Sequence, residues 1–210
     1  LEALAGIRRA ESGRIAMLGR DIDPSQEVDP AEIRRMGCAH VPEDRHHMGL
    51  VLPFEENENA ILGYQGDPRF AKGPLLDRDA MRRDAEAKIK AYDIRPPDCR
   101  LKTSNFSGGN QQKIVLAREM ERDPDVLLIG QPTRGVDVGA IEFIHRRIIE
   151  MRDAGKAILL VSVELDEIRA LSDRILVMFG GRIVGERSPD AGEGELGLLM
   201  AGIEGQEAAE

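Results

Sequence analysis

The feature of this sequence that most constrains its fold is a small-residue turn leading directly into a helical pattern. Ser107, Gly108 and Gly109 precede a stretch at 111–122 with apolar residues at helical spacing. The first N–H groups of a helix have no partner within it and carry partial positive charge, and glycines let a ligand approach the backbone. The turn is therefore suited to gripping an anion such as phosphate, although Ser107 alone also fits an ordinary helix N-cap.

The residues that follow this helix come in a recognisable order. A buried-strand run at 126–129 leads into Gly130-Gln131-Pro132-Thr133, and Asp137 follows. This order resembles the second half of the ABC ATPase domain, with its signature loop and helix, Walker B strand and D-loop. More narrowly, SGGNQQK together with QPTRGVDVGAIEFIH resembles the C-terminal ATPase domain of tandem-domain importers for simple sugars or nucleosides. The resemblance covers nearly the whole chain, from residue 1 to about 202.

Alternating strand and helix patterns predict an α/β fold with parallel strands. The resemblance implies a P-loop NTPase (ABC ATPase) fold with a mainly parallel sheet. It places a single domain at 1–203, with an α-helical subdomain at about 50–122 and a frayed tail at 204–210. Further strands are predicted at 14–18, 38–41, 157–161, 173–178 and 182–185, and further helices at 30–36, 54–62, 77–92, 138–152, 164–171 and 194–200.

The loop that wraps the β- and γ-phosphates in this family, G-x-x-x-x-G-K-[ST], does not occur in the sequence. In the resembling family, residues 1–6 are the tail of the helix that follows that loop, closed here by a glycine. We therefore expect a piece of a longer chain whose sheet lacks the P-loop strand. In the family that strand lies between the strands at 157–161 and 173–178. We expect a gap there that a neighbouring chain or a rearranged segment covers, or over which the sheet closes.

Six apolar residues of the helical subdomain are expected to form its core. In the resembling family the surface of this subdomain docks a helix of the membrane protein, and the sequence pattern fits both uses. The six residues are Phe54, Ile61, Leu62, Leu75, Leu76 and Ile89.

Composition argues against several classes of protein. The net charge of −9 argues against a nucleic-acid-binding surface, and so against a soluble ABC protein of DNA repair or translation. No apolar run approaches ~20 residues, which argues against a membrane span. Two distant cysteines, Cys38 and Cys99, favour reduced thiols in the cytosol over a disulfide framework.

Three positions lack the groups that ATP hydrolysis requires on this fold. By the resemblance, Gly130 stands where the metal-positioning aspartate belongs, Gln131 where the catalytic glutamate belongs, and Val163 at the switch-histidine position. Loss of a general base alone typically costs ~10²–10⁴ in rate. We therefore expect no intact catalytic residue and no metal site on this chain.

The signature, by contrast, is intact. In ABC dimers the signature of one domain closes over ATP held by the P-loop of the other. The resemblance therefore implies that this chain grips the partner domain's ATP in trans, with Asp137 as the D-loop aspartate that joins the two halves. The residues implied for the grip are Ser107, Gly108, Gly109, Asn110 and Gln111.

The segment after the strand at 38–41 offers two further candidates. Glu43 stands at the Q-loop position, usually a glutamine that contacts the metal and the attacking water; a solvated turn is the other interpretation. His40, His46 and His47 lie near Cys38, but their spacing matches no zinc signature. We expect solvated loop histidines there.

The resemblance implies an ATP-binding subunit of an importer, at the cytoplasmic face of the inner (plasma) membrane. The partners implied are the N-terminal ATPase domain of the same protein, membrane permease subunits and, indirectly, a solute-binding protein, with no nucleic acid. ATP and Mg²⁺ would act in the full transporter, with none expected on this chain alone, which we expect to be inactive by itself. The alternatives are a non-hydrolytic scaffold that docks within the transporter and, disfavoured by the acidic charge, a soluble ABC protein of DNA repair or translation.

Overall fold

The computed structural model describes residues 1–23 and 28–203. Its contacts divide the chain into two compact units, Leu1–Leu159 and a second that begins at Leu160. The predicted tail at 204–210 lies outside the described residues.

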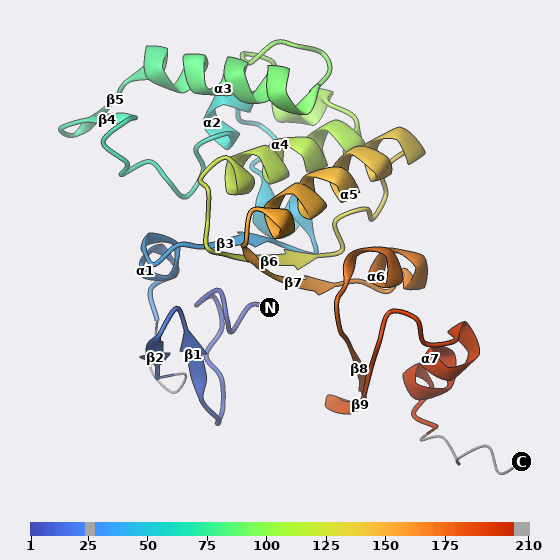
Figure 1. The fold of residues 1–210 in the computed structure, drawn as a ribbon. Helices are drawn as coiled ribbons and strands as arrows, with labels where there is room; N and C mark the ends of the chain where they lie inside the picture. The colour runs from blue at the N-terminus through green and yellow to red at the C-terminus, as the bar shows by residue number, and fades with distance from the viewer. Residues whose placement is uncertain (24–27, 204–210) are drawn as a thin grey trace, which may run out of the picture. The chain divides into compact units, whose positions relative to one another are not determined.

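A three-stranded sheet in the order β3-β6-β7 organises the first unit (Figure 1). Strands β3 (Cys38–Val41) and β6 (Val126–Gly130) run parallel, and β7 (Ala157–Val161) follows β6 in the order. All four residues of β3 and the last four of β6 are buried, as expected for parallel strands with helices over the sheet. All three strands were predicted from their apolar runs.

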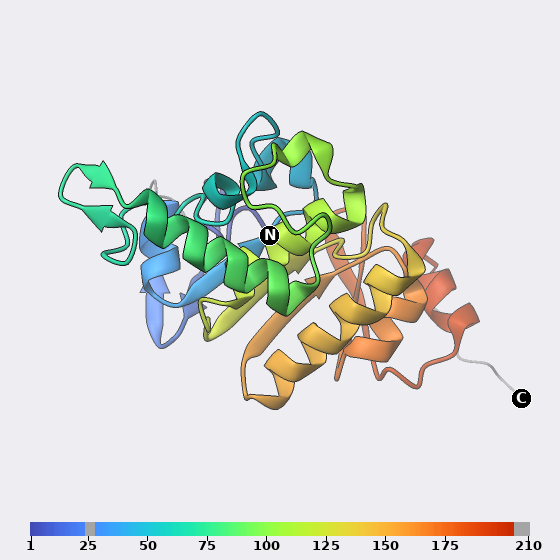
Figure 2. The same cartoon turned by 90° about the horizontal axis from the view of Figure 1, so that it is seen from above.

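Helix α4 (Gly108–Met120) is the central helix of this unit. It packs against β3, and both α3 (Arg78–Tyr92) and α5 (Val138–Asp153) pack against it (Figures 1 and 2). Every residue from Ile114 to Met120 is buried. A helix that is buried nearly all round has fixed neighbours on every side, so its first turn is held in one orientation.

Aspartate N-caps set the starts of three helices close to the predicted positions. Asp77 accepts the backbone N–H groups of Asp79 and Ala80 at the start of α3. Asp29 caps α1 (Pro30–Arg35), and Asp137 caps α5. In each case a side-chain oxygen satisfies an N–H group that the helix itself leaves without a partner.

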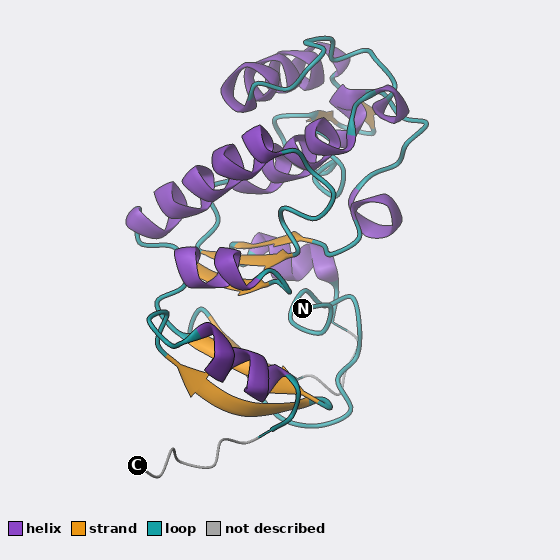
Figure 3. Cartoon of the chain, turned by 90° about the vertical axis from the view of Figure 1, so that its right-hand side faces the viewer, coloured by secondary structure: helices purple, strands orange, loops and turns teal. Residues whose placement is uncertain are grey.

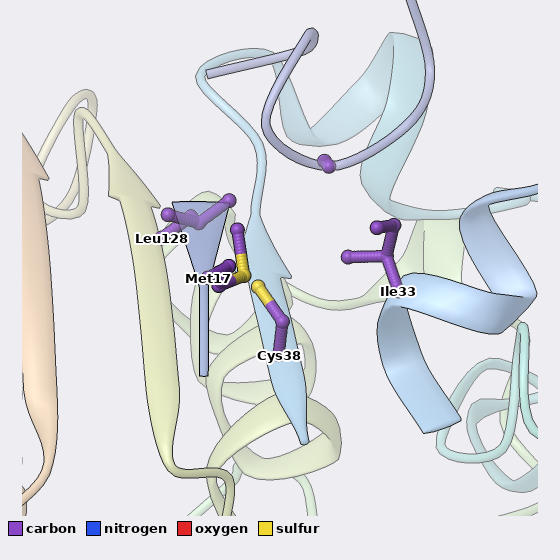
Figure 4. Packing of buried hydrophobic residues seen from close by; sticks show 5 residues of the cluster. Met17, Ile33, Cys38 and Leu128 are labelled. Carbon is purple, nitrogen blue, oxygen red and sulfur yellow. The ribbon is translucent and has the colours of Figure 1, made fainter. Parts of the chain in front are cut away.

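The N-terminal segment packs as a small layer of its own. Residues 1–6 form a turn closed by Gly6, whose φ is 74° and whose neighbour Ile7 donates to the carbonyl of Glu2 over 2.9 Å, the hydrogen-bond pattern of a helix C-cap. Strands β1 (Ile15–Met17) and β2 (Arg20–Ile22) then form an antiparallel hairpin, of which only the first strand was predicted. A cluster of side chains joins this segment to α1 and the sheet (Figure 4), made of Ala5, Met17, Ile33, Cys38 and Leu128.

The predicted helical subdomain contains less helix than expected. Helix α2 spans only Glu56–Asn59, inside the predicted 54–62. Part of the segment predicted as a loop at 65–74 instead pairs with the next residues, as β4 (Ala71–Lys72) and β5 (Leu75–Leu76). A short 3₁₀ turn, η2 (Thr103–Asn105), precedes the Ser107 turn.

The prediction that all six apolar residues lie in the subdomain core was wrong for three of them. Ile61 and Ile89 are buried, and Leu62 is half-buried. Leu75, however, is 71% exposed, and Leu76 and Phe54 are exposed as well. The two leucines lie in the β4–β5 hairpin, a sheet of only two strands among the described residues, which extends beyond the start of α3 (Figure 2).

A buried polar network ties α4 to the loops beneath it. Arg118 Nε donates to Glu119 Oε1 over 2.7 Å, and Arg118 Nη1 donates to the carbonyl of Gly49 over 2.7 Å. The second carboxylate oxygen of Glu119 accepts from the Tyr64 hydroxyl over 2.6 Å. Because both charged side chains are buried, each charge has the other as its ionic partner in place of water.

The second unit is a short α/β segment. After α6 (Leu165–Leu171), strands β8 (Ile175–Phe179) and β9 (Arg182–Arg187) form an antiparallel hairpin that turns at Gly180-Gly181, both with positive φ. Helix α7 (Glu193–Met200) packs on this hairpin (Figure 3) through Leu196 and Leu199. Among the described residues, no sheet has more than three strands, and β7 and β8 belong to different sheets.

Candidate functional site

Three loops of the first unit meet at one edge of the sheet. Because β3 and β6 are parallel neighbours, the segments at 42–47 and 131–137 leave the sheet at the same edge. The turn at 105–109 joins them as it enters α4. Ligands of open α/β folds bind at this carboxyl edge of the strands.

The Ser107 side chain is held by two donors at the start of α4. Asn110 donates to Ser107 Oγ from its side-chain Nδ2 over 2.9 Å and from its backbone N–H over 3.4 Å. Asn110 is itself oriented, because its Oδ1 accepts the backbone N–H of Arg95 over 2.7 Å. Ser107 is exposed. Its oxygen therefore accepts from within the protein while its hydroxyl hydrogen can point outward.

Gln111 holds the turn through hydrogen bonds to its backbone. This buried side chain donates from Nε2 to the carbonyls of Thr103 and Phe106, each over 3.1 Å. Its Oε1 lies 2.8 Å from His46 Nε2. The residue thus acts as a support of the turn in this structure rather than as a group exposed to a ligand.

Gly109 lies against the residue that caps α5. A Cβ built on Gly109 would lie 3.0 Å from Asp137 Oδ2, while Asp137 Oδ1 accepts the Ala140 N–H over 2.9 Å. A side chain at position 109 would require Asp137 to move by a few tenths of an ångström. The turn and the loop before α5 are therefore packed as one unit.

Gly130 and Gln131 follow the end of β6, and the space over Gly130 is filled. A Cβ built on Gly130 would collide with Glu43 Cγ and would lie 3.0 Å from both Glu43 N and Leu1 Cδ1. Gln131 adopts a left-handed conformation, with φ 48°, which costs a residue with a side chain about 1–2 kcal/mol. Glu43 itself is exposed.

Replacing Gly130 by aspartate is expected to lower the free energy of unfolding by about 1–3 kcal/mol, because the new side chain needs the space that Glu43 occupies. Adding Glu43→Ala should recover most of this loss by removing the colliding Cγ. Thermal unfolding of the single and double variants measures the coupling. Gly66→Asp is the control, since a Cβ there meets no atom within 4 Å. Equal stability of Gly130→Asp and the unmodified protein would contradict the close contact.

Val163 belongs to the second unit and is 65% exposed. Its place at the switch-histidine position stays a prediction.

The three histidines do not form a metal site. Among residues 1–23 and 28–203, no group of three or more His, Cys, Asp or Glu side chains is placed to hold a metal ion. The expectation of solvated loop histidines was wrong for His40, which is buried on β3 and whose pKa burial lowers to about 4. His46 and His47 are exposed, and their backbone N–H groups both donate to Asp44. Burial also raises the pKa of the Cys38 thiol, to about 11.

Sequence reasoning missed Arg45, which begins the π-helical turn η1 (Arg45–Gly49). Its Nη1 donates to the carbonyl of Arg134 over 2.8 Å, and a Cβ built on Gly108 would lie 2.8 Å from its other terminal nitrogen. The signal available was its position two residues after Glu43, in the loop that leaves β3 beside β6.

The family model and similar curated proteins point to the same family. The sequence matches the ABC transporter family over residues 1–134. It is 49% identical to the guanosine import ATP-binding protein NupO of Bacillus subtilis, over 99% of this chain and 40% of that protein. It is 43% identical to the nucleoside import ATP-binding protein NupA of Lactococcus lactis (96% and 40%), and 37% identical to the ribose import ATP-binding protein RbsA 2 of Rubrobacter xylanophilus (99% and 39%). The chain thus spans about 40% of the length of these curated relatives.

Solved structures show the same fold. A dimeric ATP-binding cassette in a post-hydrolysis state bound to ADP and Pi superposes with a TM-score of 0.72 at 18% identity, over 90% of this chain and 79% of that one. A nucleotide-free ATP-binding cassette from an ABC transporter gives 0.71 at 21% identity, over 95% and 78%. Each helix in the described ranges is too short or too polar to span a lipid bilayer. The family match and the shared fold agree: this chain belongs to the ABC transporter family and has the α/β fold of its ATP-binding cassettes.

Proposed function

We propose that this chain is the second nucleotide-binding domain of an ABC importer for nucleosides or simple sugars, and that it grips ATP held by its partner domain. The family and the names of the curated relatives support the importer. The observation that carries the grip is the geometry of Ser107, at the exposed start of a buried helix.

Ser107 is prepared to donate a hydrogen bond. Its oxygen already accepts from Asn110, so its hydroxyl hydrogen is available to an incoming phosphate oxygen. Gly108 and Gly109 add the N–H groups of the first helical turn, where the helix dipole favours negative charge. Because α4 is buried from Ile114 to Met120, the helix holds these donors in place and they need little rearrangement when the phosphate arrives, which is how preorganised donors stabilise developing charge.

The chain's own site is proposed to be hydrolytically degenerate. Magnesium prefers carboxylate and water oxygens in octahedral geometry. At the end of β6, Gly130 has no side chain, Gln131 offers only an amide, and the acidic side chain that lies against Gly130 is that of Glu43. These residues do not fit a magnesium site, so no hydrolytic step is assigned to them, and Mg²⁺ is expected to accompany ATP on the partner domain.

The partners follow from this assignment. The N-terminal ATPase domain of the same protein would supply the P-loop, and permease subunits would hold the pair at the cytoplasmic face of the membrane, downstream of a solute-binding protein. Asp137 is the residue proposed to face the partner domain at the D-loop. Its Oδ1 already caps α5, so an approaching partner would meet a fixed side chain.

The test is Ser107→Arg in the full-length protein assembled with its permease. ATPase activity is expected to fall by at least about 100-fold, since the hydroxyl is lost and a long side chain blocks the turn. Ser12→Arg, on an exposed bend, controls for added size and charge. Gln131→Glu should change the rate little, because Gly130 still lacks a carboxylate. Normal turnover by Ser107→Arg would refute the grip.

A scaffold without nucleotide contact is the second candidate, favoured by the missing catalytic groups at Gly130 and Gln131. An ATP analogue with a photoreactive group on its γ-phosphate separates the two. Labelling of the peptide containing Ser107 in the assembled protein supports the grip, whereas labelling confined to the partner domain supports the scaffold.

A further inference from the structure

Arg45 joins two loops that are far apart in the sequence. Its Nη1 donates to the carbonyl of Arg134 over 2.8 Å, in the loop before Asp137. On its other side the guanidinium lies against Gly108, where a Cβ would stand 2.8 Å from an Arg45 terminal nitrogen and 3.1 Å from the Gly135 carbonyl. The guanidinium thus lies between the turn at 105–109 and the loop before α5.

The positive charge of Arg45 is in an electrostatically unfavourable position. It sits beside the first turn of α4, whose partial positive charge repels cations. Burial and the neighbouring charge of Arg134 both lower the pKa of Arg45, with burial the larger cause and Asp44 opposing, although an arginine remains ionised. Its Nε is buried and has no hydrogen-bond partner among the described residues. A negative group that approaches the turn would interact favourably with the positive charge of Arg45.

His46 makes a second link from the same segment to the same turn. Gln111 Nε2 already donates to two carbonyls, so its Oε1 faces His46 and must accept from His46 Nε2–H. The segment that begins at Glu43 therefore contacts the turn at two points, through Gly108 and through Gln111.

We propose that Arg45 is a positioning residue: it holds the start of α4 against the loop before Asp137, so that Ser107 and its neighbouring N–H groups close on the nucleotide as one rigid unit. The inference rests on the proposed function of Ser107. A planar guanidinium reaches both loops at once, while a lysine ammonium offers one point charge and cannot bridge them in the same way. A small misplacement of the turn is enough to slow the reaction strongly.

The experiment measures ATPase kinetics of the full-length protein assembled with its permease. Arg45→Ala is expected to lower kcat by about 10- to 100-fold with KM changed less than threefold, since ATP is bound elsewhere and only closure is impaired. Arg45→Lys should recover only part of the loss. Added guanidinium ion at millimolar concentration should raise the rate of Arg45→Ala several-fold, but not that of Arg45→Lys, because the lysine side chain occupies the space. Arg83→Ala, an exposed arginine on α3, is the matched control and should behave as the unmodified protein.

The outcomes separate the two proposals. If Ser107→Arg is inactive but Arg45→Ala keeps its kcat within twofold, the positioning role is overturned and the grip stands. If Arg45→Ala loses kcat but guanidinium restores nothing and its melting temperature falls in parallel, Arg45 only supports the fold, and the positioning role is again overturned. If Ser107→Arg is active, the proposed function itself fails, whatever Arg45 does.

Discussion

Replacing Arg118 by alanine is expected to lower the free energy of unfolding by about 3–5 kcal/mol, the usual cost of leaving one charge of a buried ion pair without its partner. Arg118 is 3% exposed and Glu119 is not exposed at all, so water cannot replace the lost guanidinium. The variant would also leave the Gly49 carbonyl without its donor. Urea denaturation of the variant and the unmodified protein gives the difference directly.

Two further variants test whether charge is the cause. Replacing Arg118 by methionine and Glu119 by leucine together should recover much of the loss, because no buried charge is left unpaired. Arg83→Ala, on the exposed face of α3, should change stability by less than about 0.5 kcal/mol. A loss below about 1 kcal/mol for Arg118→Ala would show that the pair is not closed off from water. Because Gly49 ends the turn that Arg45 begins, the same variant should also loosen η1.

The second large effect concerns Glu56 and depends on pH. Glu56 begins α2, is fully buried, and neither of its carboxylate oxygens has a hydrogen-bond partner among the described residues. Burial raises its pKa from 4.5 to about 8; Lys88 opposes this, and Asp84 adds to it. Lys88 is occupied elsewhere, since it donates to the Ala60 carbonyl and to Asp84.

The direction in which stability changes with pH depends on whether the folded or the unfolded chain binds the proton of Glu56. Between about pH 4.5 and 8 the folded protein keeps a proton on Glu56 that the unfolded chain has released, so stability falls as pH rises through this range. A shift of this size corresponds to about 5 kcal/mol at most, fully lost above pH 8. Glu56→Gln removes the ionisable group while keeping its shape. The variant should therefore match the unmodified protein near pH 4.5 and exceed it by several kcal/mol at pH 8.5.

Urea denaturation at both pH values checks this expectation. Glu86→Gln, an exposed carboxylate on α3, is the matched control and should follow the unmodified protein at each pH. Parallel pH profiles for Glu56→Gln and the unmodified protein would show that Glu56 is hydrated or paired in solution.

Much of the secondary structure was predictable because its signals are local. The strands at 38–41 and 157–161 were predicted at their observed bounds from short apolar runs. The helices predicted at 77–92 and 138–152 begin within one residue of these bounds, where Asp77 and Asp137 cap them. The β4–β5 hairpin was missed because its strands are only two residues long and carry no alternating pattern.

The sequence by itself determined the family resemblance and the candidate gripping residues, because Ser107 to Gln111 are contiguous and their chemistry can be read in order. Only the tertiary structure decided which distant residues position Ser107 to Gln111. Arg45 and Arg134 are 89 positions apart, and Tyr64 and Glu119 are 55 apart. Glu43 meets Gly130 only because β3 and β6 lie side by side. Such contacts depend on which strands pair and which helix covers them, and no local pattern of residues specifies that choice.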